Sequence, residues 1–494
     1  MNFKTKIAHA AVLATLGLVA GSAQAVYMSQ DGTGQVLIYP YYTVQNGFDN
    51  YLSIVNTTSS AKAVKVRIIE GLASKEVLDF NLYLSAKDVW AAGLKVSTTG
   101  SGAGNVYTSD KSCTSPSIPA GGVDFVNYGY TGANADPLGG DLSRTREGYI
   151  EIIEMGEILA GSTFATNITH VAGVPKDCGW VNTQWSNAGG NVPAILSDNM
   201  RKPTGGLIGS MTLINVPQGV DYTYDPVAMD AFFTLQNLTP PGGLSPSLAD
   251  VAPKNSLVVQ RNGSAEDIFV TDWTAVNGTN PAAPVAAVLA AQHVYNEYAL
   301  DTLINAGTDW IVTLPTKRFH TAANQYSVQA PFTIAPRDTI LDAQTWLAWR
   351  ACEPISLQPY DREETTAGTV IFSPAPPNGN KLCNEANVIT FNNSKVFGSA
   401  SGLNITPSYQ NGWLDLGFTA TTQVLTSPTG ATMKVSSLGG TPVLGTASYY
   451  GLPAVGFAVE KYVNGNVGGV MSNYGGSFVH KYGRLVTFVT PQIN

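Results

Sequence analysis

Residues 34–43 read GQVLIYPYYT, and this stretch decides the fold of the chain. Successive side chains of an extended strand point to opposite sides, and here both sides are apolar. Such a strand must be covered on both faces, and Pro40 confines its own part of the strand to a sheet edge or a bulge. We expect burial inside an N-terminal sandwich, beside residues 51–55 or 64–69. The alternative is pairing with a neighbouring molecule.

Alternating apolar and polar residues dominate the sequence that follows. Residues 64–68 read VKVRI, and residues 77–84 continue the pattern after a turn near Gly71. This alternation is typical of strands that have one face on a core and the other in water. Residues 51–71 predict a β-hairpin with NTTSSAK at its tip. Short strands joined by Ser, Thr and Asn turns indicate a mainly β fold that begins with a β-sandwich-like domain.

A further strand is predicted for GYIEIIEMGEI, residues 148–158. Glu151 and Glu154 are expected at wet positions of this strand or along a pore-like seam. Residues 226–233 then predict a short helix.

The strongest helix prediction covers residues 284–305. Pro284 opens this run and Gly307 follows its end, as is usual for helix boundaries. The helix leads into a predicted strand, residues 308–320, which Pro315 interrupts. The C-terminal region is therefore expected to be β-rich and to carry one or two helices.

The length of the chain predicts more than one domain. Removing 25 residues from 494 leaves 469, which is too many for a single core. Residues 239–253 are rich in Pro, Gly and Ser and are interpreted as the join between two domains. The prediction is an N-terminal β-rich domain over 26–238 and a C-terminal β-rich domain over 254–494.

Residues 1–25 have the order of features found in a signal peptide. Lys4 and Lys6 precede an apolar run, and Ala23 and Ala25 offer a cleavage site before Val26. No later stretch approaches the ~20 apolar residues that span a bilayer. We therefore expect an exported chain, located at the cell surface, outside the cell or in the periplasm, with no transmembrane segment after cleavage.

Composition narrows the classes of partner. Charged residues make up only 13% of the chain, and the formal net charge of −8 becomes −10 without Lys4 and Lys6. This balance argues against a nucleic-acid partner, since phosphate binding needs a basic face. The 50 Gly, 28 Pro and 22 Tyr suit many short strands and turns.

Four cysteines follow the signal region, and an even number in an exported chain predicts two disulfides. Three pairings are possible, of which Cys113–Cys178 and Cys352–Cys383 best fit the division into two regions. The chain has no CxxC or HxxxH spacing, so no metal site is predicted. The histidines after residue 25 are far apart in the sequence: His170, His293, His320 and His480.

Motifs of known chemistry are mostly missing. Residues 59–62 match SxxK and residues 197–199 match SDN, but the KTG motif that completes this set is absent. The SxxK serine also falls in a polar loop rather than at the start of a buried helix. The sequence shows no GxSxG, P-loop or HExxH motif, and no cofactor is predicted.

Two charged clusters remain as candidate sites. Asp361, Arg362, Glu363 and Glu364 lie inside the loop that a Cys352–Cys383 bond would close. Paired carboxylates can act as acid and base on a glycosidic bond, but a solvated loop in which Arg362 neutralises its neighbours is the favoured interpretation, so no catalytic residue is predicted. Lys317-Arg318 at a predicted strand end could bind an anion, but two such cations usually face water.

Aromatic side chains could stack on sugar rings. Trp346 and Trp349 in TWLAWR (345–350) are the candidates for glycan contact, because they are least easily explained as core. Trp90 and Trp310 sit in strand-like runs and are expected in the core. Other tryptophans considered for glycan contact are Trp180, Trp185 and Trp413.

Several strings together resemble a group of secreted or cell-surface proteins of Gram-negative bacteria. They are GQVLIYPYYT, NTTSSAKAVKVRIIEG, EVLDFNLYLSAKDVW, TDWIVTLPTKRF, LCNEANVITF and GLPAVGFAVEKYVNG. The resemblance covers most of the chain. The group has no established activity, so it implies location and architecture but carries over no catalytic residues.

Three functions are compatible with these features. The first is a non-enzymatic, secreted structural protein of the cell surface or extracellular matrix, which associates with itself or with other surface components. The second is an extracellular or periplasmic glycan-binding module that uses Trp346 and Trp349. The third is a glycoside hydrolase that uses the carboxylates between Asp361 and Glu364.

Overall fold

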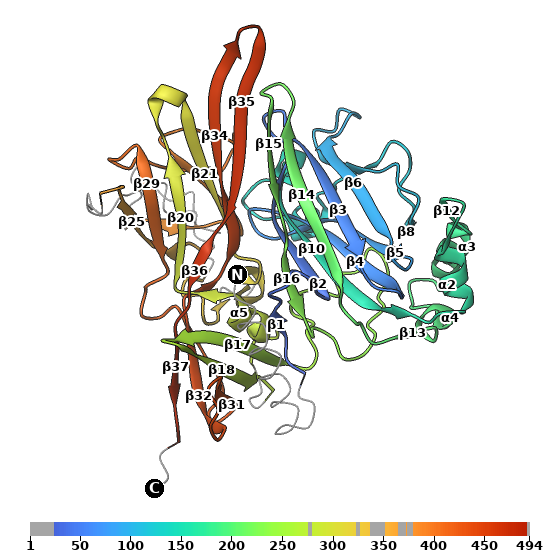
Figure 1. Cartoon of the computed structure of the whole chain (residues 1–494). Helices are drawn as coiled ribbons and strands as arrows, with labels where there is room; N and C mark the ends of the chain where they lie inside the picture. Colours follow the sequence, from blue (N-terminus) through green and yellow to red (C-terminus); the bar gives the residue numbers. More distant parts are fainter. Residues whose placement is uncertain are drawn as a thin grey trace.

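A computed structural model describes residues 24–274, 279–322, 327–335, 351–363, 372 and 379–491. β-Sheets dominate, which confirms the predicted β-rich fold. Strands β1 to β16 form one half of the molecule, and strands β17 to β37 form the other half beside and below it (Figure 1). The short helices α2, α3 and α4 lie at the outer side of the first half.

Two sheets form the N-terminal sandwich. The eight-stranded sheet runs in the order β1 (Tyr27–Met28), β16 (Val227–Asp230), β2 (Val36–Thr43), β10 (Glu147–Ile158), β4 (Ala61–Glu70), β5 (Glu76–Leu84), β8 (Cys113–Ser115), with β13 (Met200–Arg201) on β10. The six-stranded sheet runs in the order β15 (Val220–Tyr224), β14 (Leu207–Asn215), β3 (Asp49–Asn56), β6 (Val89–Val96), β7 (Gly104–Tyr107), β9 (Val123–Asp124). Their inner faces share one apolar cluster, in which Phe80 contacts the buried Trp90 at 5.6 Å between ring centroids. The predicted sandwich is therefore present.

Residues 51–71 do not form the predicted hairpin. β3 pairs with β6 and β14, whereas β4 pairs with β5 and β10, so the two strands belong to opposite sheets. The NTTSSAK segment crosses from one layer to the other. This arrangement lets Ile54 of β3 and Val66 of β4 bury their apolar faces in the same core, which direct pairing in one sheet would not achieve.

β2 is buried along its whole length, as the sequence predicts. Its neighbours are β10 and β16, so the expected position beside residues 51–55 or 64–69 is wrong. The ladder with β10 shifts register opposite Pro40, which places the proline at a bulge as expected.

Side chains complete the edge of β2 where β16 ends. β16 pairs only with residues 36–38 of β2. Farther along, the Tyr224 hydroxyl bonds the backbone of Tyr41, and the Thr313 hydroxyl donates to the Pro40 carbonyl at 2.6 Å. Because Thr313 belongs to the C-terminal half, that half caps the part of the β2 edge that β16 leaves unpaired.

The C-terminal half contains three larger sheets. The five-stranded sheet runs β28 (Leu403–Ile405), β27 (Ala386–Phe391), β21 (Ala306–Thr313), β34 (Val455–Val467), β35 (Val470–Val479). The four-stranded sheet runs β25 (Ser356–Tyr360), β29 (Asn411–Gly417), β20 (His293–Ala299), β36 (Lys481–Gly483). The lower six-stranded sheet runs β17 (Asn255–Asn262), β18 (Ala265–Asp272), β31 (Thr432–Ser436), β32 (Val443–Tyr450), β30 (Val424–Thr426), with β37 (Val486–Val489) also on β32. β21 ends before Pro315, where the sequence predicts an interruption, but the strand does not resume: residues 317–320 form the short helix α6 (Lys317–His320), so the predicted strand is wrong there.

The hydrophobic core crosses between the halves. One face of the five-stranded sheet packs on the four-stranded sheet, and the other face contributes Ile311 and Phe457 to the core of the N-terminal sandwich. Phe457 stacks on Tyr224 with ring centroids 4.3 Å apart. The division into domains at residues 239–253 therefore stays a prediction. The sheets on either side of this segment are separate, but one hydrophobic core includes residues from both sides.

Residues 239–253 lie as a loop along the outer face of the eight-stranded sheet. The Pro240 carbonyl accepts a hydrogen bond from Lys65 at 2.9 Å, and the Thr239 carbonyl accepts one from Asn81 at 2.9 Å. The loop thus satisfies polar side chains that the strands would otherwise leave buried without partners.

Two helix predictions are corrected. The helix expected over 284–305 is limited to α5 (Ala283–Leu289), and Ala290 leaves the helical conformation with φ −58° and ψ 128°. Residues 293–299, HVYNEYA, alternate between two faces and pair with β29 and β36, so strand pairing outweighs the Ala-rich helical signal. The short helix expected over 226–233 is replaced by β16, which pairs with β1 and β2.

Both predicted disulfides are confirmed: Cys113 is bonded to Cys178, and Cys352 to Cys383. These bonds are typical of proteins that mature in an oxidising compartment. In the part of the chain that the structure describes, no helix has the length and apolar character needed to cross a membrane.

We expect Leu37→Ala to lower the free energy of unfolding by about 2–5 kcal/mol, because it leaves a cavity in a fully buried strand. Leu303→Ala is the matched control, since Leu303 is 91% exposed and its loss should change stability by less than ~0.5 kcal/mol. Urea denaturation of both variants measures the difference. Equal midpoints for the two variants would contradict the burial of β2.

Candidate functional site

The outward face of the four-stranded sheet carries a row of aromatic side chains, here called the aromatic face: Tyr360, Trp413, Tyr295 and His293. This sheet lies on the side of the molecule away from the N-terminal half (Figure 1). Tyr360 and Trp413 stack with centroids 4.2 Å apart, and Tyr295 meets Trp413 edge-on at 6.1 Å. His293 lies parallel to Tyr295 at 5.7 Å. Trp413 is 38% exposed, so the row is accessible from solvent.

Polar side chains lie between the aromatic ones. In register across the sheet, Gln358 of β25, Asp415 of β29 and Lys481 of β36 share a line with Tyr295. Asp415 Oδ1 lies 2.8 Å from His293 Nδ1, and this contact holds the imidazole against the sheet. The aromatic face therefore combines ring surfaces with carboxylate, amide and ammonium groups.

Glycines make room for the rings. Gly417 and Gly483 are the cross-strand neighbours of His293 on either side. A β-carbon at Gly483 would lie 2.8 Å from the Tyr295 hydroxyl and 3.0 Å from the His293 β-carbon. A side chain at Gly483 would push the rings out of the row, whereas a side chain at Gly417 would first meet Ser356 and Thr419.

The same strands anchor the aromatic face to a rigid core. Alternate residues Val294, Leu414 and Leu416 point inward and are buried in the cluster between the four- and five-stranded sheets. A site on regular, well-packed strands is held more precisely than a site on loops. Rings that present apolar surface next to hydrogen-bonding groups suit a ligand with both C–H faces and hydroxyls.

Sequence reasoning found only one residue of this row. Trp413 was among the tryptophans considered for sugar stacking, whereas Tyr295 and His293 were assigned to a helix. Tyr295 and Tyr298 are three residues apart, which places them on one face of a helix but on opposite faces of a strand, and the pairing with β29 shows the strand.

The other tryptophan predictions have mixed outcomes. Trp346 and Trp349, the predicted glycan contacts, lie outside the described residues. Trp310 is fully buried, as predicted. Trp185 is also largely buried, and its indole nitrogen donates to the Tyr83 hydroxyl at 2.7 Å, so it packs α3 (Cys178–Asn187) against the sandwich.

The carboxylate cluster begins directly after β25. Asp361 Oδ1 accepts the backbone N–H of Glu363 at 3.0 Å, which forms a local turn. Arg362 and Glu363 are exposed, and Glu364 lies outside the described residues. The cluster therefore adjoins Tyr360 at one end of the aromatic face.

The SxxK match does not assemble a nucleophile and base. The Lys62 ammonium is fully buried and donates to Glu154 Oε1 at 2.8 Å and to Thr204 Oγ1 at 2.9 Å. Ser59 instead lines a surface cavity of about 820 Å³ between the strand-connecting loop and α2 (Thr163–Ile168). Lys62 is therefore an ion-pair partner in the fold.

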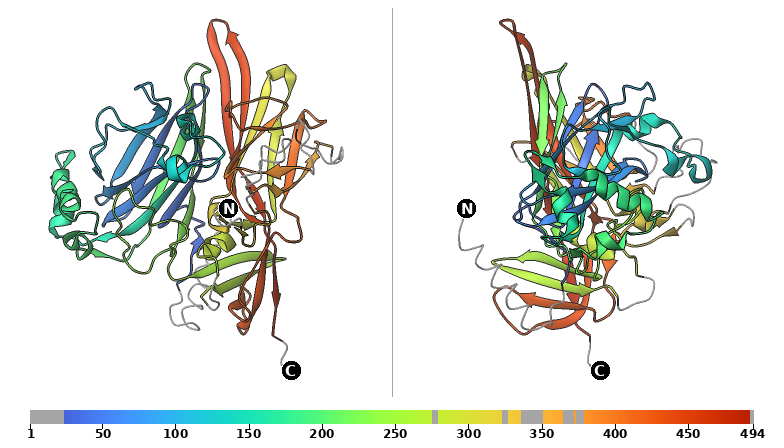
Figure 2. Two further views of the ribbon diagram at one scale, coloured as in Figure 1. Left: turned by 180° about the vertical axis from the view of Figure 1, so that it is seen from behind. Right: turned by 90° about the vertical axis from the view of Figure 1, so that its right-hand side faces the viewer.

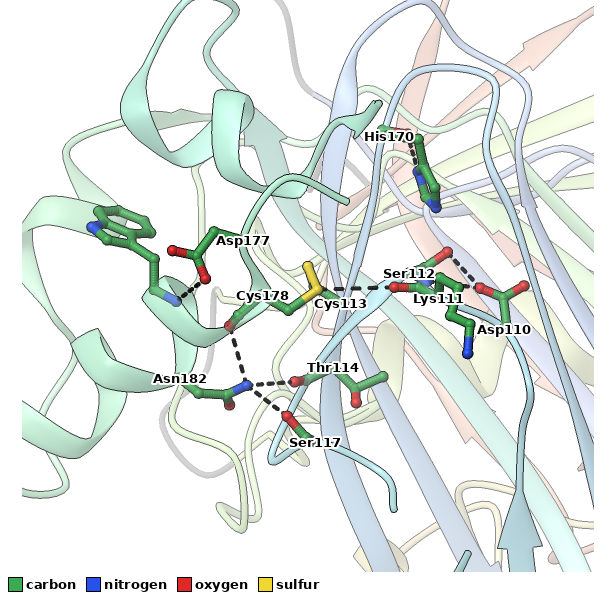
Figure 3. The surroundings of a disulfide bond; sticks show 12 residues. Asp110, Lys111, Ser112, Cys113, Thr114, Ser117, His170, Asp177, Cys178 and Asn182 are labelled. Carbon is green, nitrogen blue, oxygen red and sulfur yellow. Dashed lines mark hydrogen bonds between the residues drawn. A yellow bond between two sulfur atoms is a disulfide. The ribbon is translucent and has the colours of Figure 1, made fainter. Parts of the chain in front are cut away.

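The Cys113–Cys178 bond fastens the helical segment to the sandwich (Figure 3). Cys178 is the first residue of α3, and the Asp177 carboxylate caps this helix by accepting the Trp180 N–H at 3.0 Å. Asn182 donates to the Thr114 carbonyl at 3.2 Å and to Ser117 Oγ at 2.9 Å, beside β8.

Two expectations about charged residues are wrong. Glu151 and Glu154 are fully buried, not wet, and Lys317-Arg318 does not face water. Arg67 Nη1 and Arg318 Nη2 both donate to the Glu151 carboxylate, at 2.9 and 3.2 Å, and Lys317 donates to the Cys383 carbonyl at 2.6 Å. The C-terminal half covers the face of the sheet that carries Arg67 and Glu151. The alternation of charged residues along these strands resembles that of a solvent-exposed face, but the charges form buried ion pairs.

Buried carboxyl groups gather where the halves meet. Burial raises the pKa of Glu147 to about 7, although the Ser399 and Tyr41 hydroxyls, at 2.9 and 3.1 Å, favour its charged form. Burial likewise raises the pKa of Asp309 to about 6 and that of Glu385 to about 7. These groups lie at the junction of the two halves rather than on the aromatic face, and their burial disfavours the charged form.

Within the described residues, no group of three or more His, Cys, Asp or Glu side chains is arranged to hold a metal ion. Comparisons of the chain with models of known families, with curated proteins and with solved structures found no match. The interpretation of the aromatic face therefore depends on its own geometry.

We expect removal of the first disulfide, by Cys113→Ser with Cys178→Ser, to destabilise the protein by about 4 kcal/mol, because the bond closes a loop with a sequence separation of 65. The helical segment should also become sensitive to limited proteolysis. The matched control, Cys352→Ser with Cys383→Ser, opens a loop with a separation of 31 and should leave that segment protected. Unchanged protease resistance in the first variant would refute the anchoring role.

Glu147→Gln tests the buried carboxyl groups. A raised pKa means that folded Glu147 keeps its proton up to about pH 7, whereas the unfolded chain releases it near its ordinary pKa of 4.5. Its contribution to stability therefore falls as pH rises from about 5 to 7. We expect the variant to gain up to about 3 kcal/mol relative to wild type between pH 5 and 8, measured by urea denaturation.

The variant must be compared with the wild type at each pH, because two buried histidines change the stability of both proteins with pH in the opposite direction. Burial lowers the pKa of His320 to about 4 and that of His480 to about 3, so their contribution to stability rises with pH. Subtraction removes their effect. Glu363→Gln, at an exposed position, should show no such trend, and a constant difference for Glu147→Gln would contradict the assignment.

Proposed function

We propose that this chain is a secreted, non-enzymatic protein of the cell surface or extracellular matrix that binds carbohydrate on the aromatic face. The observation that carries the proposal is the row of Tyr360, Trp413, Tyr295 and His293 with Asp415 and Gln358 beside it. Two disulfides and the signal-like segment at residues 1–25 support export.

Carbohydrate fits the aromatic face better than other ligand classes. A pyranose ring has C–H faces that pack on aromatic rings and hydroxyls that bond carboxylates and amides. The row runs from Tyr360 on β25 through Trp413 on β29 to Tyr295 and His293 on β20, and this length suits an extended chain of sugars more than a compact metabolite. The negative net charge of the protein argues against nucleic acid.

Binding without catalysis is favoured by the arrangement of the carboxylates. Asp415 is engaged with His293 at 2.8 Å, and Asp361 accepts a backbone N–H in a turn. Within the described residues, the aromatic face also carries Glu297, the exposed cross-strand neighbour of Trp413. A glycosidase works with two carboxyl groups, one of them protonated, on either side of the bond to be cleaved, and the reducing-sugar assay below tests Glu297 for such a role.

Retention on polysaccharide gels tests the proposal. Affinity electrophoresis through soluble glucans, xylans, mannans and acidic exopolysaccharides should show retardation of the wild type on at least one. Trp413→Ala and Tyr360→Ala should each weaken binding roughly fivefold to tenfold, which corresponds to about 1–1.4 kcal/mol for one lost ring contact. Calorimetry with the retaining polysaccharide gives the affinities.

Tyr128→Ala is the matched control, because Tyr128 is an exposed aromatic outside the aromatic face. It should bind as the wild type does, and thermal melting should show that all variants are folded. Equal retention of Trp413→Ala and wild type, or release of reducing sugar from any of these polysaccharides, would reject a non-enzymatic carbohydrate site at this face.

A further inference from the structure

A buried lysine–aspartate pair lies on the outer face of the eight-stranded sheet. The Lys65 ammonium of β4 contacts Asp79 Oδ2 of β5, and the Lys65 side chain is fully buried while that of Asp79 is 7% exposed. Asp79 lies one diagonal step from Lys65, whose direct cross-strand partner is Asn81. Both strands belong to the blue N-terminal half, which Figure 2 shows from two further sides. Two full charges are thus held together with almost no access to water.

The protein groups around this pair do not use the whole ammonium. An ammonium has three N–H donors. Within the described residues, Lys65 Nζ has two oxygen partners, Asp79 Oδ2 and the Pro240 carbonyl, the latter at 2.9 Å. Asp79 Oδ2 also accepts the Gly242 N–H at 2.8 Å. Buried charges are costly unless their hydrogen bonds are complete, so this ion pair fits its surroundings imperfectly.

The same surroundings fit an amide between the two side chains. A secondary amide has one N–H and one carbonyl oxygen. The Pro240 carbonyl is placed to accept the N–H, and the Gly242 N–H is placed to donate to the oxygen. The amide carries no charge, so the penalty for burying two ions is removed. Residues 239–253 therefore already supply the hydrogen bonds that such an amide needs.

Burial also favours the forms of the side chains that react. It lowers the pKa of Lys65, although Asp79 favours the charged ammonium, and the neutral amine is the nucleophile. Burial raises the pKa of Glu76, against the opposing effect of Arg67, which donates to Glu76 Oε2 at 2.6 Å. The Glu76 charge acts on Lys65, and the Asp79 charge acts on Glu76, so the three groups are neighbours. A carboxyl that holds its proton can pass it to a leaving oxygen.

We propose that Lys65 and Asp79 form an isopeptide bond within the folded chain, with Glu76 as the proton carrier. Nζ of Lys65 bonds to Cγ of Asp79, and the bond between Cγ and Oδ1 breaks. Two protons of the ammonium, carried by Glu76, leave with this oxygen as water. One ammonium and one carboxylate become one amide and one water, so the step needs no oxidant, reductant or other reactant. The Gly242 N–H stabilises the negative charge that develops on Oδ2 during the attack.

The bond would join two strands of the N-terminal sandwich beneath the loop that leads into the C-terminal half. Unlike the two disulfides, it would persist under reducing conditions. The reaction occurs once, within the chain itself, so it is compatible with a non-enzymatic protein. The proposal goes beyond carbohydrate binding and does not depend on it, because the aromatic face belongs to the four-stranded sheet.

Intact-mass spectrometry of the reduced chain from Val26 onward tests the bond. The wild type should be lighter than its sequence by one water molecule. Trypsin should leave residues 63–67 attached to residues 76–87, because it does not cleave after a modified Lys65. Fragmentation of the linked peptides should place the bond between Lys65 and Asp79.

Lys434 and Asp267 provide a matched control in the same sample. They form an ion pair at 2.9 Å, also one diagonal step apart on two neighbouring strands, β18 and β31. The Lys434 side chain is 31% exposed, so water keeps its ammonium charged. The tryptic peptides that carry these two residues should therefore be unlinked.

Three variants test the roles of the individual groups. Lys65→Met and Asp79→Ala should each have the mass of their own sequence. Glu76→Gln should leave most of the chain unlinked, because glutamine cannot carry a proton, and circular dichroism should show that it is folded. The wild-type mass decides the bond even if a variant fails to fold. A wild-type mass equal to that of the sequence, a loss of water mapped to other residues, or complete linkage in folded Glu76→Gln would each overturn the proposal.

Discussion

Burial of both faces of β2 is the constraint on which the arrangement of the molecule depends. Leu37 and Tyr39 lie in the core of the N-terminal sandwich, whereas Val36 and Ile38 lie in a second core with α5 and the lower sheet. Each apolar face is worth about 25 cal/mol per Å² removed from water, so neither can be left open at small cost. Because the two covers come from different halves of the chain, packing this one strand holds the halves together. The four-stranded sheet is thereby placed with its aromatic face turned outward.

Charge pairing adds specificity to that contact. The outer face of the eight-stranded sheet carries Arg67 and Glu151, and Arg318 reaches this pair from the C-terminal half. Buried ion pairs contribute little net stability because both charges lose their hydration, but an unpaired member is costly. Alternative registers of the halves would separate the largely buried Arg318 from Glu151, which would then keep only Arg67 as its partner. The apolar contacts therefore provide most of the attraction, and the ion pairs select one relative position.

Local signals in the sequence predicted the strand content, the burial of β2, the core positions of Trp90 and Trp310 and the two disulfides. Strand neighbours were not predictable, because β2 pairs with strands far along the chain and alternation carries no information about distant partners. The prediction for Glu151 was wrong for the same reason. A strand face that a distant part of the chain covers can show the same alternation of charged and apolar residues as a solvent-exposed face. Of the aromatic face, Trp413 alone was identified, since the row exists only after strands β20, β25 and β29 are brought together.

The shared core has a consequence for the order of folding. Synthesis proceeds from the N-terminus, so β2 emerges long before Ile311 and Phe457, which complete the core that β2 enters. Until those residues arrive, the sandwich has an incomplete apolar interior and an uncovered strand edge at Pro40. Contacts between such distant segments form slowly, because the entropy of closing long loops opposes them. The nascent chain therefore passes through a state that invites aggregation, and a holding chaperone that recognises extended apolar segments would bind it there first.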